Sequence, residues 1–215
     1  MLIFIDSANV DEITRAASLG LCDGVTTNPT LIMKQGADHH TRISEICAVF
    51  SGPVLAEPVS SEADAIVAEG RELHAIADNV VVKIPIGMPG VEAIHRLSSE
   101  GIDCAATLIF SASQALIASK AGARFICPFV GRLDDVSTDG MEMIRQSAAL
   151  YDAYELPTQI IVASVRHPLH LIESGLAGAD GITLPFSVLA KLLSHPLTDL
   201  GIEQFRKDAQ KVGGA

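Results

Sequence analysis

The sequence is poor in aromatic residues and contains no tryptophan. Aromatic residues make up 4% of its 215 positions, although hydrophobic residues together make up 48%. The apolar content therefore comes mainly from alanine, isoleucine, leucine and valine, which is typical of parallel sheets packed under helices. A chain of this length can bury a substantial core, so we predict a single domain over residues 1–215.

Several features that mark other protein classes are missing. The four cysteines form no CxxC pair and no metal-ligand spacing, which indicates reduced cysteines of a cytosolic protein. The initial apolar run is too short for a signal peptide and lacks a basic flank. No stretch reaches the roughly 20 apolar residues that cross a membrane. We therefore expect a cytoplasmic protein without membrane contact.

Basic residues are also scarce. The chain has 15 Lys and Arg against 26 Asp and Glu, which gives a formal net charge of −11. This charge argues against nonspecific nucleic-acid binding, but a small anionic substrate needs only a few local cations. The sequence has neither a GxGxxG turn nor a P-loop, the usual marks of a bound nucleotide.

What the sequence does contain is a regular alternation of β-rich runs and helical patterns. Strands are predicted at Leu2–Ile5, Gly24–Thr27, Val54–Pro58, Val80–Pro85, Ala105–Phe110, Phe125–Phe129, Gln159–Ala163 and Gly181–Leu184. Helices are predicted at Asp11–Leu19, Asp38–Val49, Glu62–Ala77, Val91–Ser99, Ser111–Ala121, Gly140–Tyr154, Pro168–Ala177 and Ser187–Leu193, with one more at Asp199–Lys211. Helix caps are predicted at Asn9 and at Ser60 or Ser61, and helix-ending glycines at Gly20, Gly101, Gly122 and Gly178.

Eight strand–helix units without a linker favour a closed (β/α)8 barrel, or TIM barrel, with an additional C-terminal helix at about 199–211. The alternative α/β architecture is a doubly wound open sheet, which usually has a glycine-rich first turn. The first turn here is DSANVDE, so we predict the barrel.

Barrel enzymes carry their working groups at the C-terminal ends of the strands. Polar residues lie within or just after seven of the predicted strands; they are Asp6, Thr26, Asn28, Glu57, Lys83, Thr107, Arg132, Ser164 and Arg166.

Lys83 is the most unusual of them, because it lies within the apolar run VVVKIPI. Burial disfavours a charged ammonium and favours a neutral amine, which can attack a carbonyl. The alternative is a lysine whose ammonium reaches solvent or pairs with a carboxylate. Asp6 and Glu57 each follow an apolar strand and are candidate acid/base groups, since helix capping explains neither position well.

Arg132 and Arg166 follow adjacent strands and could together bind an anionic group such as phosphate. The alternative is a salt bridge with Asp134 or Asp135. His167 and His170 share a helical face, but no third ligand is apparent, so we expect no metal.

The order of several segments resembles a known family. FIDSANVDEI, GVTTNPTLI, VVVKIPI, ATLIFSASQALIASKAGA, PFVGRLDD, ASVRHP and GITLP follow one another as in the short, single-domain transaldolases, whose subfamily also contains the fructose-6-phosphate aldolases. The resemblance covers the chain from its first residue to the C-terminal helix. It implies a class I enzyme of carbohydrate metabolism that needs no cofactor.

The resemblance also implies roles for individual residues. Lys83 would form a Schiff base with the ketose and hold a dihydroxyacetone unit as iminium and enamine. Asp6 would be the acid/base of C–C cleavage, and Glu57 and Thr107 would hold a catalytic water. The donor and phosphate pocket would be formed by Thr26, Asn28, Phe129, Arg132, Ser164 and Arg166.

Four positions bear on the choice within the subfamily. Glu57 and Phe129 resemble the transaldolases, because the aldolases carry glutamine and tyrosine there. Ala105 and Cys127 depart from the transferase pattern, which has asparagine and serine at these substrate-binding positions. A thiol hydrogen-bonds weakly and a methyl group not at all, so we expect an altered donor pocket.

The resemblance therefore implies a transaldolase of the pentose phosphate pathway. It would transfer dihydroxyacetone from sedoheptulose 7-phosphate or fructose 6-phosphate to glyceraldehyde 3-phosphate or erythrose 4-phosphate. Alternatives are an aldolase that releases dihydroxyacetone, a transaldolase for another anionic ketose such as a sulfosugar, and a barrel that binds sugar phosphates without turnover. We also expect a homo-oligomer, resembling the decameric rings of the short transaldolases.

Overall fold

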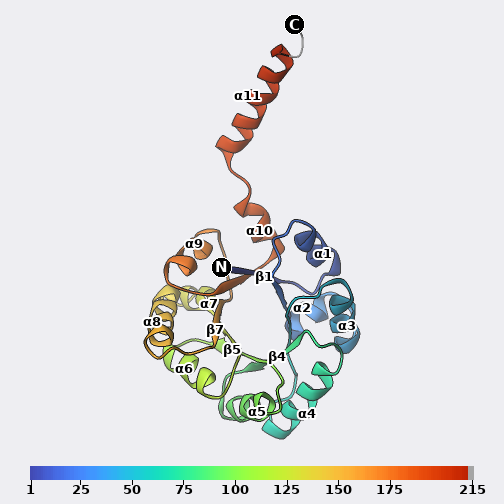
Figure 1. Cartoon of the computed structure of the whole chain (residues 1–215), viewed down its shortest axis with the longest axis vertical. Helices are drawn as coiled ribbons and strands as arrows, with labels where there is room; N and C mark the ends of the chain where they lie inside the picture. Colours follow the sequence, from blue (N-terminus) through green and yellow to red (C-terminus); the bar gives the residue numbers. More distant parts are fainter. Residues whose placement is uncertain (213–215) are drawn as a thin grey trace.

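A computed structural model describes residues 1–212, which contain a closed barrel of eight parallel strands (Figure 1). Each strand pairs with the next, and β8 closes the barrel by pairing with β1. The strands are β1 Leu2–Asp6, β2 Gly24–Thr26, β3 Val54–Ala56, β4 Val80–Pro85, β5 Cys104–Ile109, β6 Phe125–Pro128, β7 Gln159–Val162 and β8 Gly181–Leu184. The predicted (β/α)8 barrel is confirmed.

The helices surround the barrel. They are α1 Val10–Ser18, α2 Pro29–Lys34, α3 His39–Val49, α4 Ala63–His74, α5 Met88–Ser99, α6 Ala112–Lys120, α7 Val130–Asp134, α8 Gly140–Ala153, α9 Leu169–Leu176, α10 Phe186–Leu192 and α11 Pro196–Val212. The sequence pattern does not predict α2 and α7. These helices have six and five residues, which is too short for a helical repeat of apolar residues to show.

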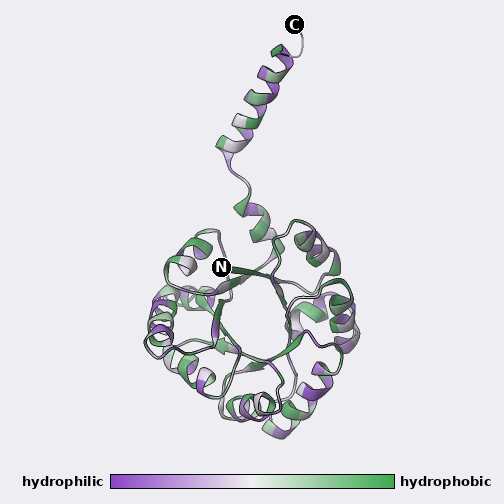
Figure 2. Ribbon diagram, in the orientation of Figure 1, coloured by the Kyte–Doolittle hydropathy of each residue, from purple (hydrophilic) through white to green (hydrophobic). Residues whose placement is uncertain are grey.

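The strands are buried on both faces, which explains their almost continuous apolar sequences (Figure 2). Side chains that alternate along one strand enter different clusters: Val81 belongs to the barrel interior, and Val82 packs under the helices. In the interior, the rings of Phe4 and Phe125 meet edge to face with centroids 5.8 Å apart. Gly24 leaves room for this packing, since a Cβ there would lie 2.4 Å from the Phe4 ring.

Local signals define most helix ends as predicted. Asn9 caps α1 by accepting hydrogen bonds from two backbone N–H groups of the first turn. The predicted serine caps of α4 are wrong, because Glu62 occupies the cap position without a side-chain hydrogen bond. Instead, the backbone N–H of Ser60 donates to Glu69 of α4. The predicted helix-ending glycines all have left-handed backbone with φ between 69° and 100°; they are Gly20, Gly101, Gly122 and Gly178.

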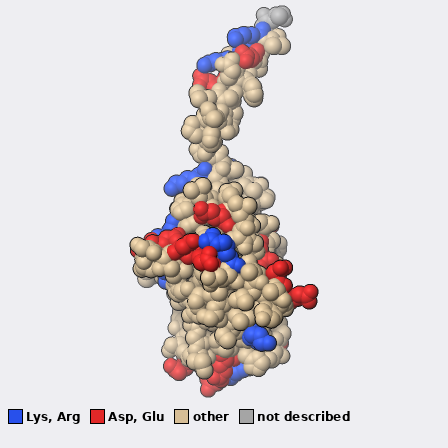
Figure 3. Space-filling model, turned by 90° about the vertical axis from the view of Figure 1, so that its left-hand side faces the viewer, with Lys and Arg blue, Asp and Glu red and all other residues tan. Residues whose placement is uncertain are grey.

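The helix α11 projects away from the barrel (Figures 1 and 3). It begins three residues before the predicted range, at a proline, which suits the first turn of a helix. None of its residues is buried. Residues 213–215, which the predicted domain includes, lie outside the described residues.

The surface charges and the hydropathy of the helices bear on what a polyanion or a membrane would require. On the face in Figure 3, basic and acidic side chains lie next to one another. The ion pair of Arg145 with Asp139, at 2.7 Å, is one example of such neighbours within the chain. Among residues 1–212, no helix combines the length and hydropathy needed to cross a bilayer.

Candidate active site

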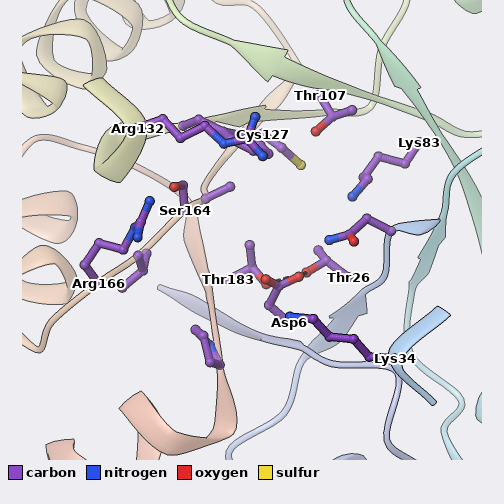
Figure 4. A pocket seen from close by; sticks show the side chains of 15 residues that line it. Asp6, Thr26, Lys34, Lys83, Thr107, Cys127, Arg132, Ser164, Arg166 and Thr183 are labelled. Carbon is purple, nitrogen blue, oxygen red and sulfur yellow. Dashed lines mark hydrogen bonds between the residues drawn. The ribbon is translucent and has the colours of Figure 1, made fainter. Parts of the chain in front are cut away.

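The C-terminal ends of the strands open into a cavity of about 400 Å³ (Figure 4). A second cavity of about 410 Å³ adjoins it and shares several wall residues. The first is lined by Asp6, Thr26, Asn28, Lys34, Lys83, Thr107, Cys127, Phe129, Arg132, Ala163, Ser164, Val165, Arg166, Thr183 and Pro185. The second adds Glu57 to the shared residues Asn28, Lys83, Thr107, Phe129 and Arg132. The barrel thus brings together every predicted site residue except Ala105.

Lys83 lies in β4 between the two cavities, and only 4% of its surface is exposed. Its Nζ lies 3.1 Å from Oε2 of Glu57 and donates a hydrogen bond to the backbone carbonyl of Thr27. The lysine is therefore buried, as predicted, and it also pairs with a carboxylate, as the alternative interpretation stated. The two interpretations are compatible, because this carboxylate also faces the cavity and can accept the proton that a nucleophilic amine must lose.

Asp6 is the last residue of β1 and belongs to a chain of hydrogen bonds (Figure 4). Its Oδ1 accepts a hydrogen bond of 2.8 Å from Thr26, whose hydroxyl lies 2.6 Å from that of Thr183. Burial raises the pKa of the Asp6 carboxyl, against the opposing effects of Lys83 and of the Thr26 hydrogen bond. A carboxylate of raised pKa is a stronger base than an exposed aspartate, which suits proton abstraction.

Thr183 is a cavity residue that sequence reasoning missed. It lies in β8, whereas the predicted site residues come from the first seven strands. Its signal was a lone hydroxyl residue within the apolar segment GITLP, comparable to the signals that identified Thr26 and Thr107.

Thr107 presents an unsatisfied polar group to both cavities. It is 1% exposed, and its Oγ1 has no hydrogen-bond partner in the described part of the chain. The next residue, Leu108, has a left-handed backbone with φ 57°, and the pairing of β5 with β6 shifts between Ala106 and Ile109. A buried hydroxyl without a partner is costly, so this group fits a site that a ligand or a water completes.

Three cations line the rim of the first cavity, and the short helices carry two of them. Arg132 belongs to α7 and lies 4.8 Å above the ring of Phe129. Lys34 ends α2 and was missed, because that helix was not predicted. Arg166 follows β7 and forms an ion pair of 2.7 Å with Asp135, as the alternative interpretation of the arginines stated. Both groups of that pair are half exposed, so an anion can compete for the guanidinium.

Asn28 and Ser164 both line the first cavity. Oδ1 of Asn28 accepts a hydrogen bond from the N–H of Leu31 and caps α2. This leaves the amide nitrogen of Asn28 as the donor available at the wall. Ser164 has a left-handed backbone with φ 61°, an uncommon conformation that often accompanies functional positions.

The two unusual positions of the sequence differ in their location. Cys127 lines the first cavity, and burial raises the pKa of its thiol to about 12. Ala105 does not reach the wall of either cavity. It is fully buried in the interior apolar cluster, two residues before Thr107 and in register with Lys83.

One of the two histidines that raised the question of a metal has another partner. His170 contacts Asp134, with 3.0 Å between Nε2 and Oδ2. Within residues 1–212, no three His, Cys, Asp or Glu side chains gather as metal ligands would. The cavity instead combines a buried amine, two carboxylates and several cations, a set that can form an imine with a carbonyl compound and move protons around it.

Comparison with known proteins finds one family over nearly the whole chain. The family model described as Transaldolase/Fructose-6-phosphate aldolase matches residues 3–215. A probable transaldolase of Methanococcus maripaludis is 55% identical over 97% of both chains. A probable transaldolase of Prosthecochloris aestuarii is 52% identical over the same shares, and one of Desulforapulum autotrophicum is 54% identical over 98% of both chains.

Proposed function

The chain belongs to the transaldolase/fructose-6-phosphate aldolase family, and we propose that it transfers a dihydroxyacetone unit through a Schiff base at Lys83. The donor would be sedoheptulose 7-phosphate or fructose 6-phosphate, and the acceptor glyceraldehyde 3-phosphate or erythrose 4-phosphate. This reaction belongs to the pentose phosphate pathway. The observation that carries the proposal is the position of the buried Lys83 amine, 3.1 Å from Glu57 and within one cavity with Asp6.

In the proposed mechanism, Glu57 takes a proton from Lys83, and the free amine attacks the ketose carbonyl carbon. A water held by Glu57 and Thr107 relays protons as the carbinolamine loses water and becomes an iminium. Asp6 then removes the proton of the C4 hydroxyl, the C3–C4 bond breaks, and its electron pair enters the iminium to form an enamine. The aldose leaves. Attack of the enamine on the acceptor aldehyde and hydrolysis of the new iminium release the product ketose and restore the amine.

The phosphate would bind to Arg132 and Arg166, because guanidinium groups form paired hydrogen bonds with phosphate oxygens. Thr26, Asn28, Phe129 and Ser164 would shape the donor site beside them.

An aldolase that releases free dihydroxyacetone is the second candidate, and a transaldolase for another anionic ketose is the third. Glu57 and Phe129 support the transferase, whereas the apolar Ala105 and the thiol of Cys127 favour an unusual donor. The purified protein should therefore be assayed on fructose 6-phosphate with and without erythrose 4-phosphate. Product formation that depends on the acceptor supports the transferase, and free dihydroxyacetone in equal yield without it supports the aldolase.

Borohydride trapping tests the mechanism itself. We expect fructose 6-phosphate plus borohydride to add a reduced three-carbon adduct to Lys83, which peptide mass spectrometry would locate. Lys83→Met should abolish the adduct and the activity, whereas a matched change at the exposed Lys207 should leave both intact. An adduct at another residue, or none in active protein, would disprove the assignment.

We also propose that the protein is a cytoplasmic homo-oligomer, resembling the decameric rings of the short transaldolases, in which α11 packs on a neighbouring copy. Along α11, Leu197, Gly201, Phe205 and Ala209 recur four residues apart. Leu197 and Phe205 are 71% and 76% exposed, and such an exposed row of apolar and small residues supports a partner surface.

A further inference from the structure

His170 is a buried histidine that the proposed reaction does not use. It is the second residue of α9, and 3% of its side chain is exposed. Its Nδ1 lies 3.3 Å from the backbone nitrogen of Arg166, and its Nε2 lies 3.0 Å from Oδ2 of Asp134. One ring therefore connects the loop after β7, which carries Arg166, with α7, which carries Arg132.

These contacts define the protonation of the ring. A backbone N–H can only donate, so Nδ1 of His170 carries no proton and Nε2–H donates to the Asp134 carboxylate. Burial lowers the pKa of His170, and His167 lowers it further, while Asp134 and Glu173 oppose them. The neutral ring that the hydrogen bonds require is thus the form that its surroundings favour.

The two arginine-bearing segments also touch directly. The N–H of Gly131, beside Arg132, donates to the carbonyl of Ser164 at 3.1 Å. A Cβ at Gly131 would lie 2.1 Å from that oxygen and 2.7 Å from Nε of Arg166. On the far side, Oδ1 of Asp134 accepts a hydrogen bond from the N–H of Gly140, which ties the end of α7 to α8.

We propose that His170 is a positioning residue that holds Arg132 and Arg166 at the spacing a phosphate group requires. This rests on the proposed function, in which the two arginines bind the substrate phosphate. Paired hydrogen bonds from guanidinium groups depend on geometry, so a shift of one segment weakens recognition without removing any charge. His170 therefore sets the preference for phosphorylated over unphosphorylated substrates and does not touch the reacting carbon.

Three substitutions separate the two contacts of the ring. His170→Asn keeps an acceptor close to the position of Nδ1, and His170→Gln keeps a donor close to the position of Nε2. His170→Ala removes both, and Arg132→Ala and Arg166→Ala calibrate the full loss of phosphate binding. His95→Ala, an exposed change on α5 that lies outside the two cavities at the strand ends, is the matched control.

Each variant would be assayed for inhibition by inorganic phosphate, for kcat and KM on fructose 6-phosphate, and for borohydride trapping of unphosphorylated dihydroxyacetone. For His170→Ala we expect the inhibition constant of phosphate and the KM to rise about tenfold, with kcat changed less than about twofold. Trapping should stay at the level of the unchanged protein. His170→Asn and His170→Gln should each give a smaller rise, a partial rescue that general loss of packing would not give.

The inference is overturned if folded His170→Ala binds phosphate as well as the control, or if trapping of dihydroxyacetone falls as much as use of fructose 6-phosphate. If His170→Ala does not fold, the same comparison is decided by the Asn and Gln variants, each of which keeps one contact. Should Arg132→Ala and Arg166→Ala also leave phosphate inhibition unchanged, the proposed phosphate site itself is wrong. If the arginine variants lose phosphate inhibition but His170→Ala keeps it, only the role of His170 is contradicted.

Discussion

Nζ of Lys83 and Oε2 of Glu57 lie 3.1 Å apart, with 5% and 13% of their side chains exposed. Lys83 lies in the middle of β4 and Glu57 directly follows β3, and the barrel pairing places the two strands side by side. Two charges that are withdrawn from water depend on each other, because either one alone would be left without compensation.

Removing one partner of this pair should therefore destabilise the protein. We expect Glu57→Gln to lower the free energy of unfolding by about 3 kcal/mol, and Lys83→Met in the same chain to recover part of the loss. Urea denaturation of both single variants and the double variant measures this coupling. The exposed pair of Lys207 and Glu203 is the matched control, and Glu203→Gln should change stability by less than about 0.5 kcal/mol. Additive effects at Lys83 and Glu57 would contradict the prediction.

Asp6 should weaken the fold at neutral pH. Its pKa in the folded protein is raised, chiefly by burial, above the ordinary value of 3.8, so folding favours the protonated form. The stabilisation that the protonated carboxyl of Asp6 gives the folded state is therefore fully present below pH 3.8. It is lost as the pH rises through the higher pKa of Asp6 in the folded protein. We expect Asp6→Asn to raise the melting temperature at pH 7 relative to the unchanged chain, and the difference to vanish at low pH.

Asp38 provides a control of opposite sign for this experiment. It caps α3, and the hydrogen bonds from Thr41 lower its pKa. Its stabilisation is present above the ordinary aspartate value and is lost as the pH falls through the lower folded value. Asp38→Asn should therefore reduce the melting temperature at pH 7. Equal responses of Asp6→Asn and Asp38→Asn across the pH range would refute the assigned environments.

The three cations at the rim of the first cavity should contribute unequally to the binding of phosphorylated substrates. Arg132→Ala and Arg166→Ala should each raise the KM for phosphorylated substrates about tenfold or more, since a charged hydrogen bond contributes about 1.5–3 kcal/mol. Lys34→Met should have a smaller effect, because an exposed ammonium is a single, screened point charge. Unphosphorylated analogues serve as the control substrates. Equal losses on both substrate types would rule out phosphate recognition by these residues.

Position 127 should tune the donor site. Cys127→Ser places a stronger hydrogen-bonding group at the cavity wall, and a neutral hydrogen bond contributes about 0.5–1.5 kcal/mol. We expect a severalfold rise in kcat/KM on fructose 6-phosphate with erythrose 4-phosphate, and no rise for Cys127→Ala. A folded serine variant without any gain would indicate a pocket adapted to another donor. Ala105→Asn, in contrast, should cost about 1–3 kcal/mol of stability, because it overfills the interior cluster.

The apolar row on α11 should control assembly. Leu197→Asp together with Phe205→Asp would place charges on the proposed contact surface, and light scattering should then show a smaller particle than for the unchanged protein. Lys207→Gln, on the same helix, is the control and should assemble normally. A stable monomer of the unchanged protein at micromolar concentration would exclude the proposed role of α11.

The architecture and most of the candidate site follow from the amino-acid sequence alone. Alternating apolar strands and helical repeats predict a barrel, and a barrel directs the strand ends to one rim, so Asp6, Glu57, Lys83 and Thr107 could be assigned to one site from their positions alone. Asn9 and the helix-ending glycines could be read locally, because capping depends on only a few neighbouring residues.

Which of these groups come into contact, and through which atoms, depends on the packing of the strands. The ion pair of Lys83 with Glu57 and the hydrogen-bonded chain from Asp6 to Thr183 depend on strand register, which joins residues far apart in the sequence. The same register keeps Ala105 inside the apolar cluster, away from the cavity wall. The short helix α7 and the contacts of His170 likewise depend on hydrogen-bond partners from elements far away in the sequence, which no local pattern encodes.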